Sequence, residues 1–288
     1  MTLDVGIHDG IPAEVYHADP APAPSLSSSI GKLLIQKAPL HAWFSHPRLN
    51  PAFERPGNKV MDAGTVAHQV LLHGNEDGMV VIDADSWRTK LAQEVRDAAW
   101  AAGKTPLLAH QLLGIHAMVK AAREYVALSE LAGIFERGKP EQTVIWKEGD
   151  NWCRCRPDFW TDDHSIMIDY KSTATNAEPN TFVRQMMSMG YDFQGAFYRR
   201  GAFEVARELP DFIFLVQENT PPYACSLIGM AEPMLDLAER KVQYAIDQWA
   251  IHMQSRKWSG YPRRIAYAEP PEYAVRSFEE LIDQGGQA

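Results

Sequence analysis

Cysteine is scarce in this sequence, and long apolar runs are absent. Three cysteines among 288 residues are too few for a disulfide framework or for an iron–sulfur cluster held by four thiolates. No segment approaches the ~18 consecutive apolar residues of a membrane helix. The opening MTLDVGIHDG lacks the basic and apolar regions of a secretory signal. We therefore expect a cytoplasmic protein with no membrane partner.

The chain also lacks an excess of positive charge. Its 28 Lys and Arg against 37 Asp and Glu residues give a formal net charge of −9, whereas phosphate backbones are bound most readily by basic proteins. For an enzyme this argument is weak, because only the surface facing the nucleic acid must be positive and a bound metal supplies further charge. The composition therefore leaves nucleic acid open as a partner.

Two motifs that suggest cofactors are incomplete. The stretch AAGKT (101–105) resembles the end of a phosphate-binding loop, but Ala98 stands where the full motif needs a glycine. Cys153 and Cys155 share one face of a predicted strand, but a zinc site needs two further ligands and none is patterned nearby. We therefore expect no ATP site at this position and two buried, apolar cysteines.

Hydrophobic periodicity predicts helices at both ends of a cluster of strands. Helices are expected over 24–39, 62–74 (with Asp62 or Thr65 near the start and Gly74 at the end), 90–100, 107–135, 181–205 and 231–254, and strands over 79–83, 141–160 (a hairpin), 165–172 and 211–217. This order indicates one α/β domain with a small mixed central sheet flanked by helices. Residues 61–257 would form its core, with a helical and loop elaboration over 1–60 and a tail over 258–288.

A run of serines precedes the first expected helix. Ser25, Ser27, Ser28 and Ser29 stand before an apolar stretch at helical spacing. Such serines commonly cap the helix N-terminus, and they also suit an anion site at that position. Capping is the commoner outcome, and the pattern assigns no role to an individual serine.

The stretch RPDFWTDDHSIMIDYKST carries the strongest chemical signal. Asp169 and Lys171 lie two residues apart on a predicted strand, so they share one face. Asp158 belongs to the preceding strand, and the polar loop between them can return the chain so that the two carboxylates converge. Two such carboxylates suit a hard divalent cation, and a neighbouring lysine can orient water or neutralise charge on a phosphate. An isolated D-x-K triplet is more often a surface ion pair worth under ~1 kcal/mol.

Further motifs accompany this triplet. The segments around Asp158 and Asp169 resemble the PD-(D/E)xK signature of the restriction-endonuclease-like nuclease superfamily. GTVAH, ending at His68, resembles the upstream G-x-x-x-H motif of its RecB-like branch. QGAFY resembles the downstream Q-x-x-x-Y motif, and its Gln194 and Tyr198 are four residues apart, on one face of a helix. The opening YHADPAPAPSLSSSIGKLLIQKAPLHAWF and the closing WSGYPRRIAYAEPPEYA are similar to RecE-like exonucleases of phages and prophages.

The resemblance implies a restriction-endonuclease-like core and a role for each motif residue. It implies metal ligation by Asp158, Asp169, the Tyr170 carbonyl and His68, water activation or transition-state stabilisation by Lys171, and DNA positioning by Gln194 and Tyr198. It also implies Mg²⁺ as cofactor, with Mn²⁺ as a substitute.

Function and partners follow from the same resemblance. RecE-like relatives digest linear double-stranded DNA from its 5′ ends and leave 3′ single strands for a single-strand annealing protein, and they form a homo-oligomeric ring. Arg199 and Arg200, beside Tyr198, are the favoured lining of a DNA path. Two alternatives remain: an endonuclease or repair nuclease of the same superfamily, and a non-catalytic DNA-binding assembly protein.

Overall fold

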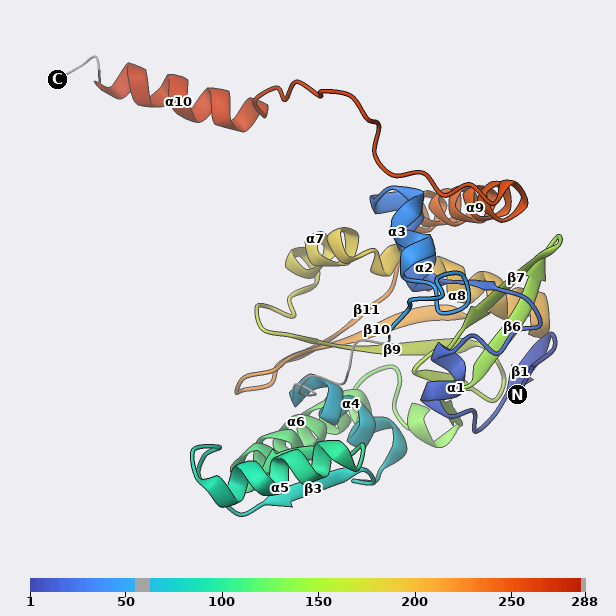
Figure 1. Ribbon diagram of the computed structural model, residues 1–288. Helices are drawn as coiled ribbons and strands as arrows, with labels where there is room; N and C mark the ends of the chain where they lie inside the picture. The colour runs from blue at the N-terminus through green and yellow to red at the C-terminus, as the bar shows by residue number, and fades with distance from the viewer. Residues whose placement is uncertain (55–62, 286–288) are drawn as a thin grey trace.

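A central mixed sheet lies between two layers of helices in the computed structural model, which describes residues 1–54 and 63–285 (Figure 1). The strands are β1 Gly6–His8, β2 Ser25–Ser27, β3 Met79–Ile82, β4 Thr105–Leu108, β5 Gly138–Pro140, β6 Thr143–Glu148, β7 Asn151–Cys155, β8 Phe159–Thr161, β9 Ile166–Thr173, β10 Asp211–Glu218 and β11 Cys225–Ile228. The helices are α1 Ala13–His17, α2 Ser28–Gln36, α3 Pro39–Phe44, α4 Ala63–His73, α5 Lys90–Ala101, α6 Ala109–Ala127, the 3-10 turn Ile134–Glu136, α7 Pro179–Met189, α8 Tyr191–Ala206, α9 Glu232–Ser255 and α10 Glu272–Gly285.

The central sheet has the strand order β11-β10-β9-β8-β5. Its two longest strands, β9 and β10, run parallel with Asp169 opposite Phe214, whereas β8 runs antiparallel to β9 with Phe159 opposite Ile168. The loop between β8 and β9 thus returns the chain as the sequence predicts. The hairpin places Asp158, the residue just before β8, close to Asp169 on β9.

Both faces of the central sheet are covered, each by a different set of helices. Met167 belongs to the apolar core under α2, α7, α8 and α9, whereas Ile168 and Tyr170 belong to the core under α4 and α6. Figure 1 shows these two helical layers above and below β9, β10 and β11. Because alternate residues of β9 enter opposite cores, a shift of one residue would put Asp169 in the wrong layer.

The N-terminal region contributes strands as well as helices. β1 and β2 flank the hairpin β6–β7 in a sheet of order β1-β6-β7-β2. The sequence predicts only turns around a single helix in this region. Strands of three residues are too short to show an alternating pattern, so periodicity does not reveal them.

A short strand replaces the start of an expected helix. The helical pattern over 107–135 begins, in the structure, with β4, and α6 follows it from Ala109 to Ala127. β4 pairs in parallel with β3, with Leu107 opposite Val81. Pairing with a distant strand therefore overrides the local helical pattern. Asp62, an expected capping residue of α4, lies outside the described residues.

The helix expected over 181–205 is two helices that meet at Gly190. This glycine has a φ of +65°, and a methyl group on its Cα would lie 2.7 Å from Lys32 Cδ of α2. A left-handed backbone and this close approach both favour glycine. The break turns α8 so that its N-terminal turns pack against α2 and the central sheet.

Just beyond α9 the chain still contacts the body of the molecule, since Trp258 packs on Trp249 and the Ser259 carbonyl accepts a hydrogen bond of 3.0 Å from the Leu40 N–H. After these residues it leads away. Residues 256–271 form an extended connection, and α10 lies away from the other elements (Figure 1). The sequence predicts a tail after residue 257 but not a helix within it. Across the described residues, no helix combines the length and apolar character that crossing a membrane requires.

Candidate active site

Asp158 is held by a side chain and by the backbone. Its Oδ2 lies 3.1 Å from Nε2 of His68 on α4 and accepts a hydrogen bond of 2.8 Å from the backbone N–H of Tyr170 on β9. The upstream histidine and the first acid of the nuclease-like motif are therefore in direct contact. Tyr170 itself stands between Asp169 and Lys171 in the sequence of β9.

Asp169 is fully buried and has two side-chain partners. Gln194 of α8 donates a hydrogen bond of 2.5 Å from its amide nitrogen to Asp169 Oδ2. The Lys171 ammonium forms an ion pair with Oδ1, which accepts no other hydrogen bond from residues 1–54 and 63–285. The strand alternation thus brings Asp169 and Lys171 together as predicted, and the downstream motif reaches the same carboxylate.

The charges at this site shift one another's pKa values. Burial and the nearby Asp158 carboxylate raise the pKa of Asp169 to about 6. Burial also acts to raise the pKa of Asp158, but the adjacent His68 outweighs it and the pKa is lowered. For Lys171 burial acts to lower the pKa, and the carboxylates of Asp169 and Asp158 reverse this, so that the pKa is raised. The lysine is therefore held as an ammonium between two acids that repel each other.

The donor set fits a magnesium ion with few protein ligands. Asp158 and Asp169 supply carboxylate oxygens, and the buried Asp169 Oδ1 has the Lys171 ammonium as its partner among the described residues. In the part of the chain that the structure describes, His, Cys, Asp and Glu side chains form no group of three that would hold a metal alone. Magnesium typically takes one or two carboxylates and otherwise keeps water or substrate oxygens. The two carboxylates match this requirement, and the resemblance implies His68 and the Tyr170 carbonyl as further ligands.

Tyr198 lies in the apolar core behind Gln194. Its side chain is 7% exposed and packs edge-to-face on Phe212, with 5.8 Å between the ring centroids. Gln194, one turn earlier, turns its amide to Asp169 instead of toward solvent. The two residues share a helix face as the spacing predicts. Because both side chains are buried, they are better placed to support Asp169 than to contact a phosphate or a terminal nucleotide, the role expected from the sequence.

Gln217 is a supporting residue that the sequence analysis does not identify. It accepts a hydrogen bond of 2.7 Å from the Tyr170 hydroxyl, and its own amide donates to the carbonyl of Met118 on α6 at 3.0 Å. This buried network fixes Tyr170, whose backbone N–H holds Asp158. Gln217 could have been recognised from the sequence as the glutamine that ends the apolar strand DFIFLVQ, because a buried amide there needs hydrogen-bond partners.

The arginines expected along a DNA path have structural partners. Arg200 forms a bidentate pair with Glu148, at 2.6 Å from Nε and 2.8 Å from a terminal nitrogen. Arg199 donates from Nε to the carbonyl of Pro210 at 2.8 Å. Neither contact points to DNA.

The prediction for Cys153 and Cys155 is confirmed, because both are fully buried in the apolar core.

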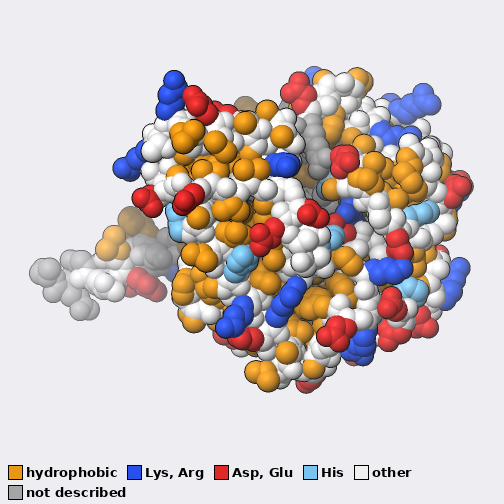
Figure 2. Space-filling view, turned by 90° about the horizontal axis from the view of Figure 1, so that it is seen from below, with side chains coloured by type: hydrophobic (Ala, Val, Ile, Leu, Met, Phe, Trp, Pro, Cys, Tyr) orange, Lys and Arg blue, Asp and Glu red, His pale blue; other side chains and the backbone are white. Residues whose placement is uncertain are grey.

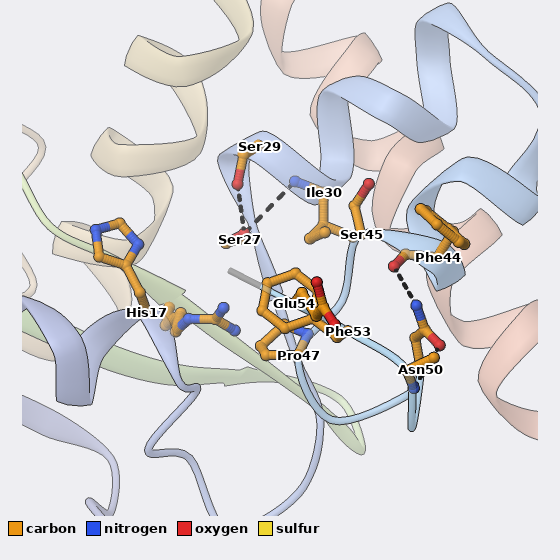
Figure 3. A pocket seen from close by; sticks show the side chains of 12 residues that line it. His17, Ser27, Ser29, Ile30, Phe44, Ser45, Pro47, Asn50, Phe53 and Glu54 are labelled. Atoms are coloured by element: carbon orange, nitrogen blue, oxygen red, sulfur yellow. Dashed lines mark hydrogen bonds between the residues drawn. The ribbon is translucent and has the colours of Figure 1, made fainter. Parts of the chain in front are cut away.

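The serine run borders a pocket of about 560 Å³ at the start of α2. Ser27 accepts a hydrogen bond of 3.5 Å from the backbone N–H of Ile30 and lies 3.0 Å from the Ser29 hydroxyl. Figure 3 shows both contacts at the pocket wall, with His17 and Glu54 also facing the pocket. Of the two alternatives for the serines, the structure shows N-capping by Ser27.

One solved structure resembles the whole fold. A candidate exonuclease from Eubacterium rectale superposes with a TM-score of 0.58 at 11% identity, over 92% of this chain and 97% of that chain. An alkaline exonuclease from Laribacter hongkongensis gives a TM-score of 0.25 at 12% identity, over 65% of this chain and 95% of that chain, which is too low to indicate a shared fold. No curated protein matches the sequence.

The first of these similarities, together with the mixed central sheet, confirms the restriction-endonuclease-like core predicted from the sequence. A family model described as a PDDEXK-like domain of unknown function (DUF3799) matches residues 45–271. Because this match spans most of the 288 residues, the chain belongs to that family.

Proposed function

We propose that this protein is a magnesium-dependent exonuclease that hydrolyses phosphodiester bonds of linear double-stranded DNA. The observation that carries the proposal is the convergence of His68, Asp158, Asp169 and Lys171 from three separate segments of the chain. A scaffold protein without catalysis would gain nothing from a buried carboxylate whose charge is opposed by a second carboxylate. The E. rectale neighbour, named as a candidate exonuclease, supports the same reaction class.

Each side chain would contribute binding, orientation or charge. A bound magnesium ion would polarise the phosphodiester and acidify a water molecule. Asp158 and Asp169 would hold that ion, while His68 and the Tyr170 N–H keep Asp158 in place. Lys171 would face the phosphate as an ammonium and stabilise charge that develops during the reaction. Gln194 would keep Asp169 oriented.

The finer parts of the proposal rest on the resemblance to RecE-like exonucleases. They are digestion from 5′ ends, release of 3′ single strands for a single-strand annealing protein during recombination, a homo-oligomeric ring, and a cytoplasmic location in a bacterium or a phage-infected cell. A ring that encloses the strand would keep the enzyme on its substrate between cleavage steps.

The test is digestion of linear duplexes labelled at one 5′ end or one 3′ end, with magnesium. Wild type should shorten the duplex from its ends. Asp158→Ala, Asp169→Ala and Lys171→Ala should each lose at least about 100-fold in rate, with melting curves that show a folded protein. Lys139→Ala, which removes only a surface pair with Asp9, is the matched control. Full activity of folded Lys171→Ala would refute the assigned role.

Two further substrates separate the remaining alternatives. An exonuclease needs an end, so covalently closed circular DNA should resist digestion, and cleavage of the circle would indicate an endonuclease. Calcium is larger than magnesium and should support binding without cleavage. Binding with no cleavage in any of these metals would instead indicate a non-catalytic DNA-binding protein.

A further inference from the structure

Lys32 of α2 reaches the candidate active site from the N-terminal region. Its ammonium lies 5.9 Å from the centroid of the Tyr191 ring, and Lys171 lies 4.8 Å from the same centroid. The aliphatic part of Lys32 crosses Gly190, where even a methyl group would be 2.7 Å from Cδ. Two lysines from different segments therefore converge on one aromatic ring at the start of α8.

The Lys32 ammonium has no ion pair or hydrogen bond among residues 1–54 and 63–285, although its side chain is partly buried. Both neighbouring carboxylates have other partners. Asp169 is paired with Lys171, and Asp192 accepts a hydrogen bond of 2.5 Å from Lys241. Lys32, Asp192 and Lys241 line the same small cavity. Both acids near Lys32 are thus paired with other lysines, although Asp192 Oδ1 is buried and accepts no hydrogen bond from the described residues.

An ammonium in this position is electrostatically costly without an anion. Burial and the like charge of Lys171 lower the pKa of Lys32, and the two acids offset this only in part. A phosphate oxygen that approached Lys171 would relieve the repulsion between the lysines and give Lys32 a charge-assisted hydrogen bond. On the face seen from below, which is the side of α4 and α6, Figure 2 shows acidic and basic side chains interspersed.

We propose that Lys32 binds a backbone phosphate of the DNA strand that occupies the active site. This inference rests on the proposed function and adds to it a binding residue from outside the nuclease-like motifs. It makes α2 part of the substrate site, at the point where the stem of Lys32 crosses Gly190.

The salt dependence of DNA binding tests this contact without any cleavage. Affinity for a labelled linear duplex is measured in calcium over a range of KCl concentrations for wild type, Lys32→Met, Lys32→Arg and Lys37→Met. Each phosphate contact to duplex DNA adds about 0.9 to the slope of log affinity against log salt. We expect Lys32→Met to lower the slope by about this amount and Lys32→Arg to keep it. Lys37, exposed just after the same helix, should have no effect.

Steady-state digestion in magnesium gives the second readout. Lys32→Met should raise KM about tenfold while kcat changes less than about threefold, since a contact made equally in the ground and transition states alters KM alone. If Lys32 had only a structural role, Lys32→Met would instead lower the melting temperature and leave the salt dependence of binding unchanged.

The outcomes distinguish the two proposals. If wild type digests linear duplex but Lys32→Met keeps the wild-type slope and KM, the role of Lys32 is refuted and the proposed function stands. If wild type binds DNA and digests none, the proposed function fails, and a reduced slope in Lys32→Met still supports the phosphate contact. A wild type that neither binds nor digests DNA overturns both.

Discussion

Gln194 and Asp169 join helix α8 to strand β9 by one buried hydrogen bond of 2.5 Å. The pair links the downstream and central parts of the nuclease-like motif set. A glutamine suits this position, because an amide N–H donates to a carboxylate without adding charge to the site. The other oxygen of Asp169 pairs with Lys171 and, under the proposed function, would also bind magnesium.

Replacing Gln194 should therefore impair the reaction more than the fold. Gln194→Leu removes the donor to a carboxylate that would hold the metal, and such supporting contacts are typically worth 10–100-fold in activity or metal affinity. We expect a loss in this range in single-turnover digestion, partly recovered at higher magnesium. Gln185→Leu on α7, whose side chain accepts a hydrogen bond from the Thr173 hydroxyl, serves as the comparison. Equal rates for Gln194→Leu and wild type would remove the positioning role.

Magnesium should stabilise the folded protein in the absence of DNA. A ligand that binds only the folded state adds about 2.7 kcal/mol at a concentration of 100 times its dissociation constant, and two mutually repelling acids gain most from a cation. The measurement is the melting temperature against magnesium concentration. Asp158→Asn should abolish the rise, whereas Asp162→Asn, in the exposed loop after β8, should retain it. A rise of the same size in Asp158→Asn would place the binding site elsewhere.

His46 should make stability depend on pH. It is fully buried, donates from Nε2 to the Ser25 carbonyl at 3.1 Å, and accepts at Nδ1 from the backbone N–H of Arg48 at 3.1 Å. The contact at Nδ1 requires a neutral ring, because a protonated Nδ1 cannot accept a hydrogen bond. Burial lowers the pKa of His46 to about 4, with Arg154 assisting and Asp19 opposing.

Because the unfolded chain takes up this proton near its ordinary pKa, the stabilisation is present above pH ~6.5 and is lost as the pH falls toward ~4. The loss is about 3 kcal/mol. Urea unfolding of wild type and His46→Gln between pH 7 and 4.5 measures it. The difference between them should shrink as the pH falls, whereas the exposed His110→Gln should follow wild type throughout. A constant difference would contradict the assignment to His46.

Two helical glycines should respond in opposite directions to alanine. A methyl group at Gly201 of α8 would lie 2.8 Å from the Trp146 ring, which is fully buried, so Gly201→Ala should cost about 1–3 kcal/mol. At Gly114 of α6 the nearest atom is 3.7 Å away, and alanine should add up to about 1 kcal/mol through helix propensity. Thermal or urea unfolding gives both values. Stabilisation by Gly201→Ala would show that Trp146 can move aside.

The sequence predicts the geometry of β9 well because its pattern is local. The spacing of two between Asp169 and Lys171 fixes their common face, and the short loop before Ile166 limits where Asp158 can lie. The spacing of four residues between Gln194 and Tyr198 likewise places both on one face of α8. What the spacing does not reveal is burial, which turns Gln194 toward Asp169 and places Tyr198 in the core.

Lys32 and Gln217 could not be found in the same way. Lys32 enters the site because α2 docks at the junction of α7 and α8, and no feature of its neighbouring residues reports that contact. Gln217 acts through partners on β9 and α6. The three-residue strands β1 and β2 are also invisible in the sequence, since they exist only through pairing with β6 and β7.

That pairing has a consequence for synthesis of the chain. Arg154 bonds Ser25 across a separation of 129 residues, so the N-terminal segment leaves the ribosome long before its partner strand does. Until then β2 and the following helix have no sheet to join, and contacts of such high sequence separation form slowly. Helix α2, which carries Lys32, would therefore dock only after β7 has been synthesised. Until then the nascent chain would lack the proposed phosphate contact and would not bind DNA through it.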